Sequence, residues 1–140
     1  MKILIDTNVL VDVFYNREPF VHDAQKVLNL VEVHQVQGFI TANSVTDLHY
    51  VLMRALKDKE VVKEAMRVLL ALVKIIDVTG EDIRKAFLLD GKDFEDDLQC
   101  VCAERAKMDY IVTRNVKDFG SSKVPAIEPE NFLAMFFETS

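Results

Sequence analysis

Four aspartates occupy places where carboxylates from distant parts of the chain could converge. Asp6 ends a short apolar run, and Asp118 follows another. Asp47 and Asp96 fall in the first turns of two expected helices. Four carboxylates that met would repel one another unless a cation held them. Mg²⁺ and Mn²⁺ prefer oxygen ligands, polarise phosphodiesters and activate water, so the pattern points to metal-assisted hydrolysis of a phosphate ester.

Each of these aspartates also has a purely structural explanation. Asp6 could cap the helix that follows it. Ser44-x-x-Asp47 and Asp93-x-x-Asp96 both fit the N-cap and N3 positions of a capping box variant, where a carboxylate also favours the helix dipole. The two roles are compatible, because an N3 carboxylate keeps lone pairs for a metal. The joint arrangement therefore has to decide between them.

Apolar periodicity predicts the elements that would position these side chains. Short strands are expected at residues 3–5, 39–42, 74–79 and 109–113, with a short fifth within 123–129. Helices are expected between them, at 7–16, 19–37, 43–56, 62–73, 80–88, 94–107 and 128–137. Thr79 and Asp82 form a capping box variant before one helix. Alternating strands and helices predict an α/β fold, a three-layer α/β/α sandwich on a mainly parallel sheet of about five strands.

Length and composition favour one domain over residues 1–140. Half of the residues are hydrophobic, but no apolar run reaches the roughly 18 residues of a membrane span, so we expect no membrane segment. We also expect no signal peptide and a cytoplasmic location. Cys100 and Cys102 fit buried thiols in a reducing compartment. The net charge of −6 argues against a protein that coats nucleic acid, but not against one that cuts it with bound cations.

Other catalytic motifs are missing from the sequence. It contains no glycine-rich nucleotide loop, no G-x-S-x-G elbow and no H-E-x-x-H pair. The first strand leads into Asp-Thr-Asn rather than the Asp-x-Asp that is typical of metal-dependent phosphatases. A phosphatase is therefore a weaker hypothesis than a nuclease.

Four segments together carry a resemblance to a known family. They are "ILIDTNVLVD", "SVTDLHYVLMR", "DFEDDLQCVCAERAKMDYIVTRNVKDF" and "VPAIEPENFL", which span nearly the whole chain. The pattern resembles the PIN domain family of metal-dependent ribonucleases, close to VapC-type toxins. The resemblance implies a parallel sheet with an acidic Mg²⁺ or Mn²⁺ pocket and cleavage of RNA to a 3′-hydroxyl and a 5′-phosphate. It further implies an antitoxin partner and a homodimer.

Matched by position, the resemblance assigns the catalytic and metal-binding acids to Asp6, Asp47, Asp96 and Asp118. Asp97 competes with Asp96, which is preferred because Ala103 then falls on the small-residue position of the family pattern. The chain departs from the commonest VapC form at Asn115, where the fourth acid usually follows Thr-Arg. Asp118 would then supply the missing charge.

Further residues are expected to support these acids or to bind RNA. The groups expected to orient the carboxylates are Thr7, Asn8, Thr113 and Asn115. The groups expected to bind RNA are Tyr50, Arg54, Arg114 and Lys117, the cations through phosphates and the tyrosine by stacking on a base. Solvated surface cations are the simpler interpretation of the three basic residues.

Two alternatives stay open at this point. The neutral Asn115 favours a PIN-like fold that has lost rapid catalysis and works as an RNA-binding or partner-binding module. The apolar C-terminal segment "NFLAMFFETS" favours docking into the core, but also fits a homodimer interface.

Overall fold

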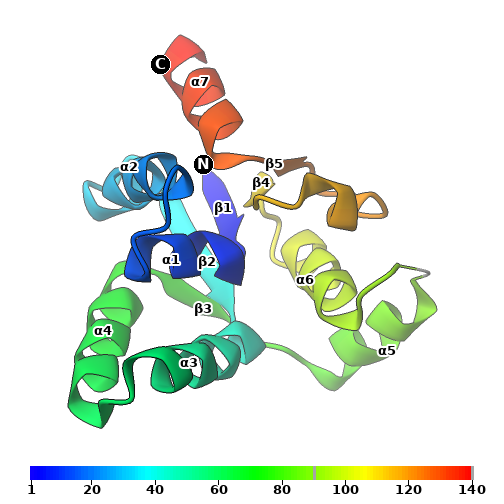
Figure 1. Cartoon of the computed structure of the whole chain (residues 1–140). Helices are drawn as coiled ribbons and strands as arrows, with labels where there is room; N and C mark the ends of the chain where they lie inside the picture. Colours follow the sequence, from blue (N-terminus) through cyan, green and yellow to red (C-terminus); the bar gives the residue numbers. More distant parts are fainter. Residues whose placement is uncertain (90, 140) are drawn as a thin grey trace.

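The computed structural model describes residues 1–89 and 91–139, and a parallel sheet lies at its centre (Figure 1). The strands run in the order β3 (Lys74–Ile76), β2 (Gln37–Thr41), β1 (Lys2–Ile5), β4 (Tyr110–Val112) and β5 (Ala126–Ile127). The chain winds outwards from β1 in one direction through β2 and β3, and in the other through β4 and β5. The winding reverses between β1 and β4, and α/β sheets bind ligands beyond the carboxyl ends of their strands at such a switch point.

Helices cover both faces of the sheet. Successive side chains of β1 point to opposite faces, and the apolar ones on each face need a covering layer. Ile3 and Ile5 pack into one core and Leu4 into another. The first core is shared with α1 (Thr7–Phe14), α2 (Phe20–Glu32), α3 (Ala42–Leu56), α4 (Lys59–Leu72) and α7 (Pro129–Thr139). The second core is shared with α5 (Gly80–Leu88) and α6 (Phe94–Arg105). The three-layer α/β/α sandwich predicted from the sequence is confirmed.

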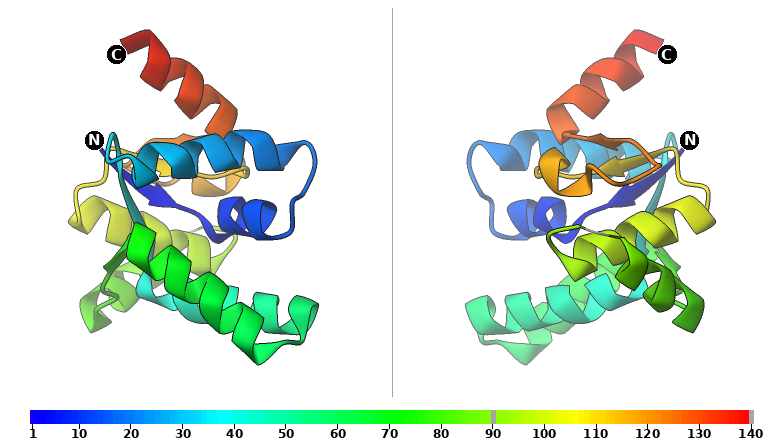
Figure 2. Two further views of the ribbon diagram at one scale, coloured as in Figure 1. Left: turned by 90° about the vertical axis from the view of Figure 1, so that its left-hand side faces the viewer. Right: turned by 90° about the vertical axis from the view of Figure 1, so that its right-hand side faces the viewer.

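The C-terminal helix α7 projects away from the layers, as Figure 2 shows. Phe132 and Leu133 near its start are buried in the first core, which agrees with the expected docking, whereas Phe137 is 63% exposed. Within the part of the chain that the structure describes, no helix is both long and apolar enough to cross a bilayer.

The second and third strands differ most from their predicted bounds. The third strand was expected to continue to residue 79 but ends at Ile76, and the backbone oxygen of Asp77 accepts a hydrogen bond from Arg105 Nη2. Asp77 thus bonds to a helix instead of a neighbouring strand. The second strand begins at Gln37 instead of residue 39, and the helix predicted to reach residue 37 already ends at Glu32. Gly38 therefore lies within β2, where a Cβ atom would be 2.9 Å from Val31 Cγ2, so glycine lets α2 pack closely on this strand.

Helix starts show which capping predictions are correct. The capping box of Thr79 and Asp82 is present at the start of α5. The corresponding prediction for Ser44 and Asp47 is wrong, because β2 passes directly into α3 and the helix already begins at Ala42. Ser44 Oγ lies 2.8 Å from Thr41 Oγ1 in a buried hydrogen bond. Asp47 consequently lies in the second turn of α3, where capping does not account for it.

Candidate active site

Asp6 stands at the switch point between β1 and β4. It occupies the N-cap position of α1, yet its side chain makes no capping hydrogen bond, so the simple structural explanation fails. Its buried carboxylate instead accepts hydrogen bonds from Thr113 Oγ1 at 2.8 Å and from Gln99 Nε2 at 3.2 Å. Thr113, which follows β4, and Gln99 on α6 thus fix the carboxylate of Asp6, which follows β1.

The environment of Asp6 works against its negative charge. Burial raises the pKa of Asp6, and the hydrogen bonds from Thr113, Gln99 and the Thr7 amide only partly offset that effect. The charge of Asp118 raises the pKa of Asp6 further. Asp118 itself is exposed on the short 3₁₀ helix η1 (Val116–Phe119).

Asp96 joins the same electrostatic site from the first turn of α6. Burial is the largest cause that raises the pKa of Asp96 to about 7, followed by the charges of Asp6, Asp93, Asp118 and Glu95. Asp93 caps the helix, with its Oδ1 accepting from the amides of Glu95 and Asp96, as the sequence predicts. The charges of three of the four expected acids, Asp6, Asp96 and Asp118, therefore act on one another.

Asp47 approaches these acids through Glu95, which sequence reasoning missed. Glu95 is exposed, but partial desolvation of its carboxyl raises its pKa, and the charge of Asp47 and a side-chain hydrogen bond with it raise that pKa further. Asp6 also acts on Glu95 through its charge. Glu95 directly precedes Asp96 at the start of a helix, and that adjacency was the available signal.

Asp97, the competitor of Asp96, faces another part of the molecule. Its carboxylate fills the space where a Cβ atom on Gly91 would lie. Its buried Oδ1 has no hydrogen-bond partner among the described residues. The geometry therefore favours Asp96 over Asp97 as the third acid.

Polar groups around Asp6 form a connected network. Asn8 Nδ2 donates to Thr113 Oγ1 at 3.4 Å, and the Asn115 amide donates to the same oxygen at 3.0 Å. Thr7 contributes its backbone amide to Asp6. The four residues expected to orient the carboxylates therefore lie around it, although the Asn115 side chain is exposed. Gln99 was missed, and its position one helical turn after Asp96 could have indicated it.

The expected RNA-binding residues lie in different settings. Arg54 and Tyr50 are exposed on α3, with Arg54 Nη1 donating to Tyr50 Oη at 3.2 Å. Lys117 is exposed on η1 beside Asp118. Arg114 is only partly accessible, because its guanidinium is paired with Asp12.

The donor set fits a hard divalent cation by its chemistry, since carboxylate oxygens are the ligands that Mg²⁺ and Mn²⁺ prefer. In residues 1–89 and 91–139, however, no three His, Cys, Asp or Glu side chains are grouped closely enough to hold a metal ion as they stand. The acids share a site electrostatically, and ligation would draw them together.

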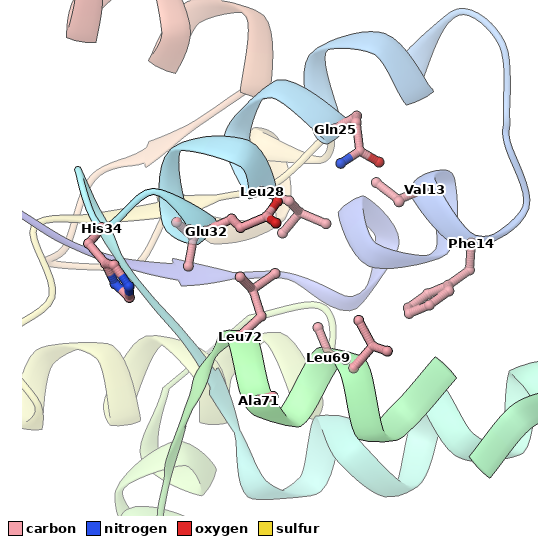
Figure 3. A pocket seen from close by; sticks show the side chains of 11 residues that line it. Val13, Phe14, Gln25, Leu28, Glu32, His34, Leu69, Ala71 and Leu72 are labelled. Atoms are coloured by element: carbon pink, nitrogen blue, oxygen red, sulfur yellow. The ribbon is translucent and has the colours of Figure 1, made fainter. Parts of the chain in front are cut away.

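Other reactive groups do not contribute to this site. Cys100 and Cys102 are free and buried, and burial raises the pKa of their thiols to about 11 and about 12. His22 on α2, His49 on α3 and His34 in the turn after α2 are exposed. A hollow of about 450 Å³ between α1, α2 and α4 is lined mainly by apolar side chains such as Phe14, Leu28 and Leu72 (Figure 3). None of the acids above lines that hollow.

Comparison with known proteins identifies the family. The family model described as PIN domain matches residues 2–117. The chain belongs to the PIN domain family. The curated relative Ribonuclease VapC1 of Aquifex aeolicus is 28% identical over 138 residues, which cover 94% of this chain and 92% of the relative. The PIN assignment expected from the sequence is thus confirmed.

Solved structures of toxin–antitoxin complexes share the PIN fold of this chain. VapBC2 from Rickettsia felis, bound to a promoter DNA fragment, matches with a TM-score of 0.67 at 18% identity, over 91% of this chain and 98% of the other. A toxin–antitoxin complex from Klebsiella pneumoniae matches with a TM-score of 0.67 at 22% identity, over 90% and 96% of the two chains. At these identities the match establishes the fold.

Proposed function

We propose that this PIN domain is a Mg²⁺- or Mn²⁺-dependent endoribonuclease. The observation that carries the proposal is the concentration of negative charge at the switch point, where burial and neighbouring carboxylates raise the pKa of Asp96 to about 7. Structural ion pairs neutralise acids, whereas these acids repel one another. A site of this kind is suited to a cation, and the relative named Ribonuclease VapC1 supports RNA as the substrate.

The proposed ion would be held by Asp6, Asp96 and Asp118, with Asp47 and Glu95 beside them. When bound, a divalent ion supplies Lewis-acid polarisation of the scissile phosphodiester. Thr113 and Gln99 fix the orientation of the Asp6 carboxylate through their hydrogen bonds. The expected products are a 3′-hydroxyl and a 5′-phosphate.

RNA binding is assigned to exposed groups near the acids. Lys117 is on the same 3₁₀ helix as Asp118, and Arg54 is on the same helix as Asp47. Their charges would attract phosphates, while the exposed ring of Tyr50 could stack on an unpaired base. These contacts would hold single-stranded RNA across the carboxyl ends of the strands.

A protein partner is part of the same proposal. The structural neighbours are toxin–antitoxin complexes, so we propose that the chain is the toxin of such a pair, inhibited by a cognate antitoxin. A homodimer is proposed as well, supported by the exposed Phe137 of the C-terminal helix α7. Sedimentation velocity at micromolar concentration tests the dimer, and a monomer would count against it.

A second candidate function is an RNA-binding or partner-binding module with weak catalysis. The neutral, exposed Asn115 is the observation that favours it, because the commonest VapC form has an acid there. This module would bind RNA equally well with and without a divalent ion and would leave it intact.

Incubation of a mixed single-stranded RNA with Mn²⁺, Mg²⁺ or EDTA separates the two functions. The nuclease proposal predicts cleavage with either metal and none in EDTA. Intact RNA in all three reactions, with the protein folded and the RNA bound, would favour the module.

A further inference from the structure

Arg114 is held in a closed environment. Its Nε and Nη2 atoms donate to the two oxygens of Asp12, at 2.5 Å and 3.1 Å. The Asp12 side chain is 1% exposed and that of Arg114 is 24% exposed. The guanidinium carbon also lies 4.3 Å from the centre of the Phe20 ring. The cation is thus bound bidentately by one carboxylate and stacked on an aromatic ring, which is the geometry that arginine favours.

The solvent side of Arg114 is unfavourable for a phosphate. Arg114 lines a cavity of about 340 Å³ together with Phe20, and the acids that line the same cavity are Asp23, Glu128 and Glu130. A polyanion that approached through this opening would meet three carboxylates before it met the arginine. It would also have to compete with the buried Asp12 for the same donors, and would leave that carboxylate unpaired.

The backbone of Arg114 is tied to the network around Asp6. Its amide donates to Asn8 Oδ1 at 3.4 Å, and Asn8 Nδ2 donates to Thr113 Oγ1. Asn8 and Asp12 are four residues apart on α1 and therefore lie on the same face of that helix. The ion pair and the Asn8 bonds together hold the segment after β4 against α1. That segment contains Thr113, which bonds Asp6, and leads directly to Asp118.

From these contacts we infer that Arg114 is a positioning residue. Through Asp12 it holds the loop of residues 113–119 in register with Asp6, so that Thr113 and Asp118 reach the acidic site. This role replaces the phosphate contact expected for Arg114 from the sequence. The inference rests on the proposed function only where it predicts how Arg114 affects metal binding and cleavage, because the contacts within the loop need no ligand.

The test compares Arg114→Gln and Asp12→Asn with the wild type. Arg67→Gln is the matched control, because Arg67 pairs with Glu64 in an exposed ion pair on α4. Three quantities are measured: amide hydrogen exchange of residues 113–119 in EDTA, the affinity for Mn²⁺ alone by calorimetry, and the affinity for single-stranded RNA in EDTA over a range of salt. Steady-state cleavage then gives kcat and KM.

Positioning predicts the same result for both variants. Exchange over 113–119 rises, Mn²⁺ affinity falls about tenfold or more, and kcat falls more than KM changes. RNA affinity in EDTA and its dependence on salt stay as in the wild type, and Arg67→Gln changes none of these quantities. A variant that carries both substitutions is no more impaired than either single variant, because the two substitutions remove the same ion pair.

A phosphate role predicts the opposite pattern and would overturn the inference. Arg114→Gln would then weaken RNA binding and reduce the salt slope by about one, with loop exchange unchanged. Asp12→Asn would release the arginine and strengthen RNA binding. If either variant does not fold, Arg114→Lys keeps the charge but loses the bidentate geometry and is measured instead. A wild type that neither binds Mn²⁺ nor cleaves RNA would refute the proposed function, and loop exchange would still decide the role of Arg114.

Discussion

Thr113 Oγ1 donates a hydrogen bond of 2.8 Å to Asp6 Oδ2, and this contact joins the residues that follow β1 and β4. The two strands are paired in register at Ile5 and Val112, so the fold itself delivers both side chains to one point. The same hydroxyl accepts from the Asn115 amide. Thr113 therefore connects the first acid with the loop that leads to Asp118.

Replacing Thr113 by valine tests that connection. Thr113→Val keeps the shape of the buried side chain but removes the donor, so the pKa of Asp6 should rise further and Mn²⁺ affinity should fall about tenfold or more. Calorimetry with Mn²⁺ measures the loss. Thr113→Ser restores the hydroxyl and should restore most of the affinity, and a serine variant as weak as the valine one would contradict this role.

The pKa of Asp96 predicts an unusual pH dependence for the metal-free protein. This carboxyl has an ordinary pKa of 3.8 and a folded-state pKa of about 7. Between these two values the folded chain binds more protons than the unfolded chain, so the free energy of unfolding falls as pH rises from about 4 to about 7, and this contribution is constant above that. Thermal unfolding in EDTA across this range measures the trend.

Asp96→Asn is the control for that trend, because the amide does not titrate. Its stability should fall less between about pH 4 and about pH 7 than that of the wild type. Mn²⁺ affinity of the wild type should rise over the same range, since the metal competes with the proton. Identical pH profiles for the wild type and Asp96→Asn would show that Asp96 ionises normally.

Gln99 should matter for the site more than for stability. Its Nε2 donates to Asp6, while its buried Oε1 has no hydrogen-bond partner among the described residues. Gln99→Met loses one hydrogen bond but also removes an unpaired buried oxygen, so the free energy of unfolding should change by about 1 kcal/mol or less. Mn²⁺ affinity should nevertheless fall about tenfold. Chemical denaturation and calorimetry measure the two effects, and a large loss of stability with normal metal binding would assign Gln99 to the core instead.

Arg54 is predicted to bind RNA without supporting the fold. It is exposed and contacts Tyr50 on its own helix, so Arg54→Ala should change stability by about 0.5 kcal/mol or less. The affinity for single-stranded RNA at low salt should fall, with a salt slope smaller by about one. Fluorescence anisotropy measures both, with Arg67→Ala as an exposed arginine control. An unchanged affinity at low salt would remove Arg54 from the interface.

The layers of the fold could be predicted because they follow from local patterns. The apolar run of β1 and the capping box of Thr79 and Asp82 are visible in the sequence itself. The start of α3 could not be placed in the same way, because Ser44-x-x-Asp47 satisfies a capping pattern while the direct passage from β2 to α3 determines where the helix begins. Boundaries of this kind depend on tertiary contacts.

The sequence indicated Asp6, Asp96 and the supporting Thr113, but it did not indicate two other groups that hold residues of the candidate site. Asp6 and Asp96 stand at element ends that a parallel sheet brings together. Gln99 and Asp12 act through hydrogen bonds to residues about 90 and 100 positions away, at Asp6 and Arg114. No local spacing indicates such partners. Arg114 was consequently expected to face RNA, whereas the structure pairs its guanidinium with the buried Asp12.

The most direct test of the account compares the wild type with Asp6→Asn, both for Mn²⁺ binding by calorimetry and for RNA cleavage in Mn²⁺ and in EDTA. The account predicts that the wild type binds Mn²⁺ and cleaves only with the metal, and that Asp6→Asn folds but loses both properties. Cleavage by the wild type that persists in EDTA, or an Asp6→Asn variant that still binds Mn²⁺ and cleaves normally, would contradict it.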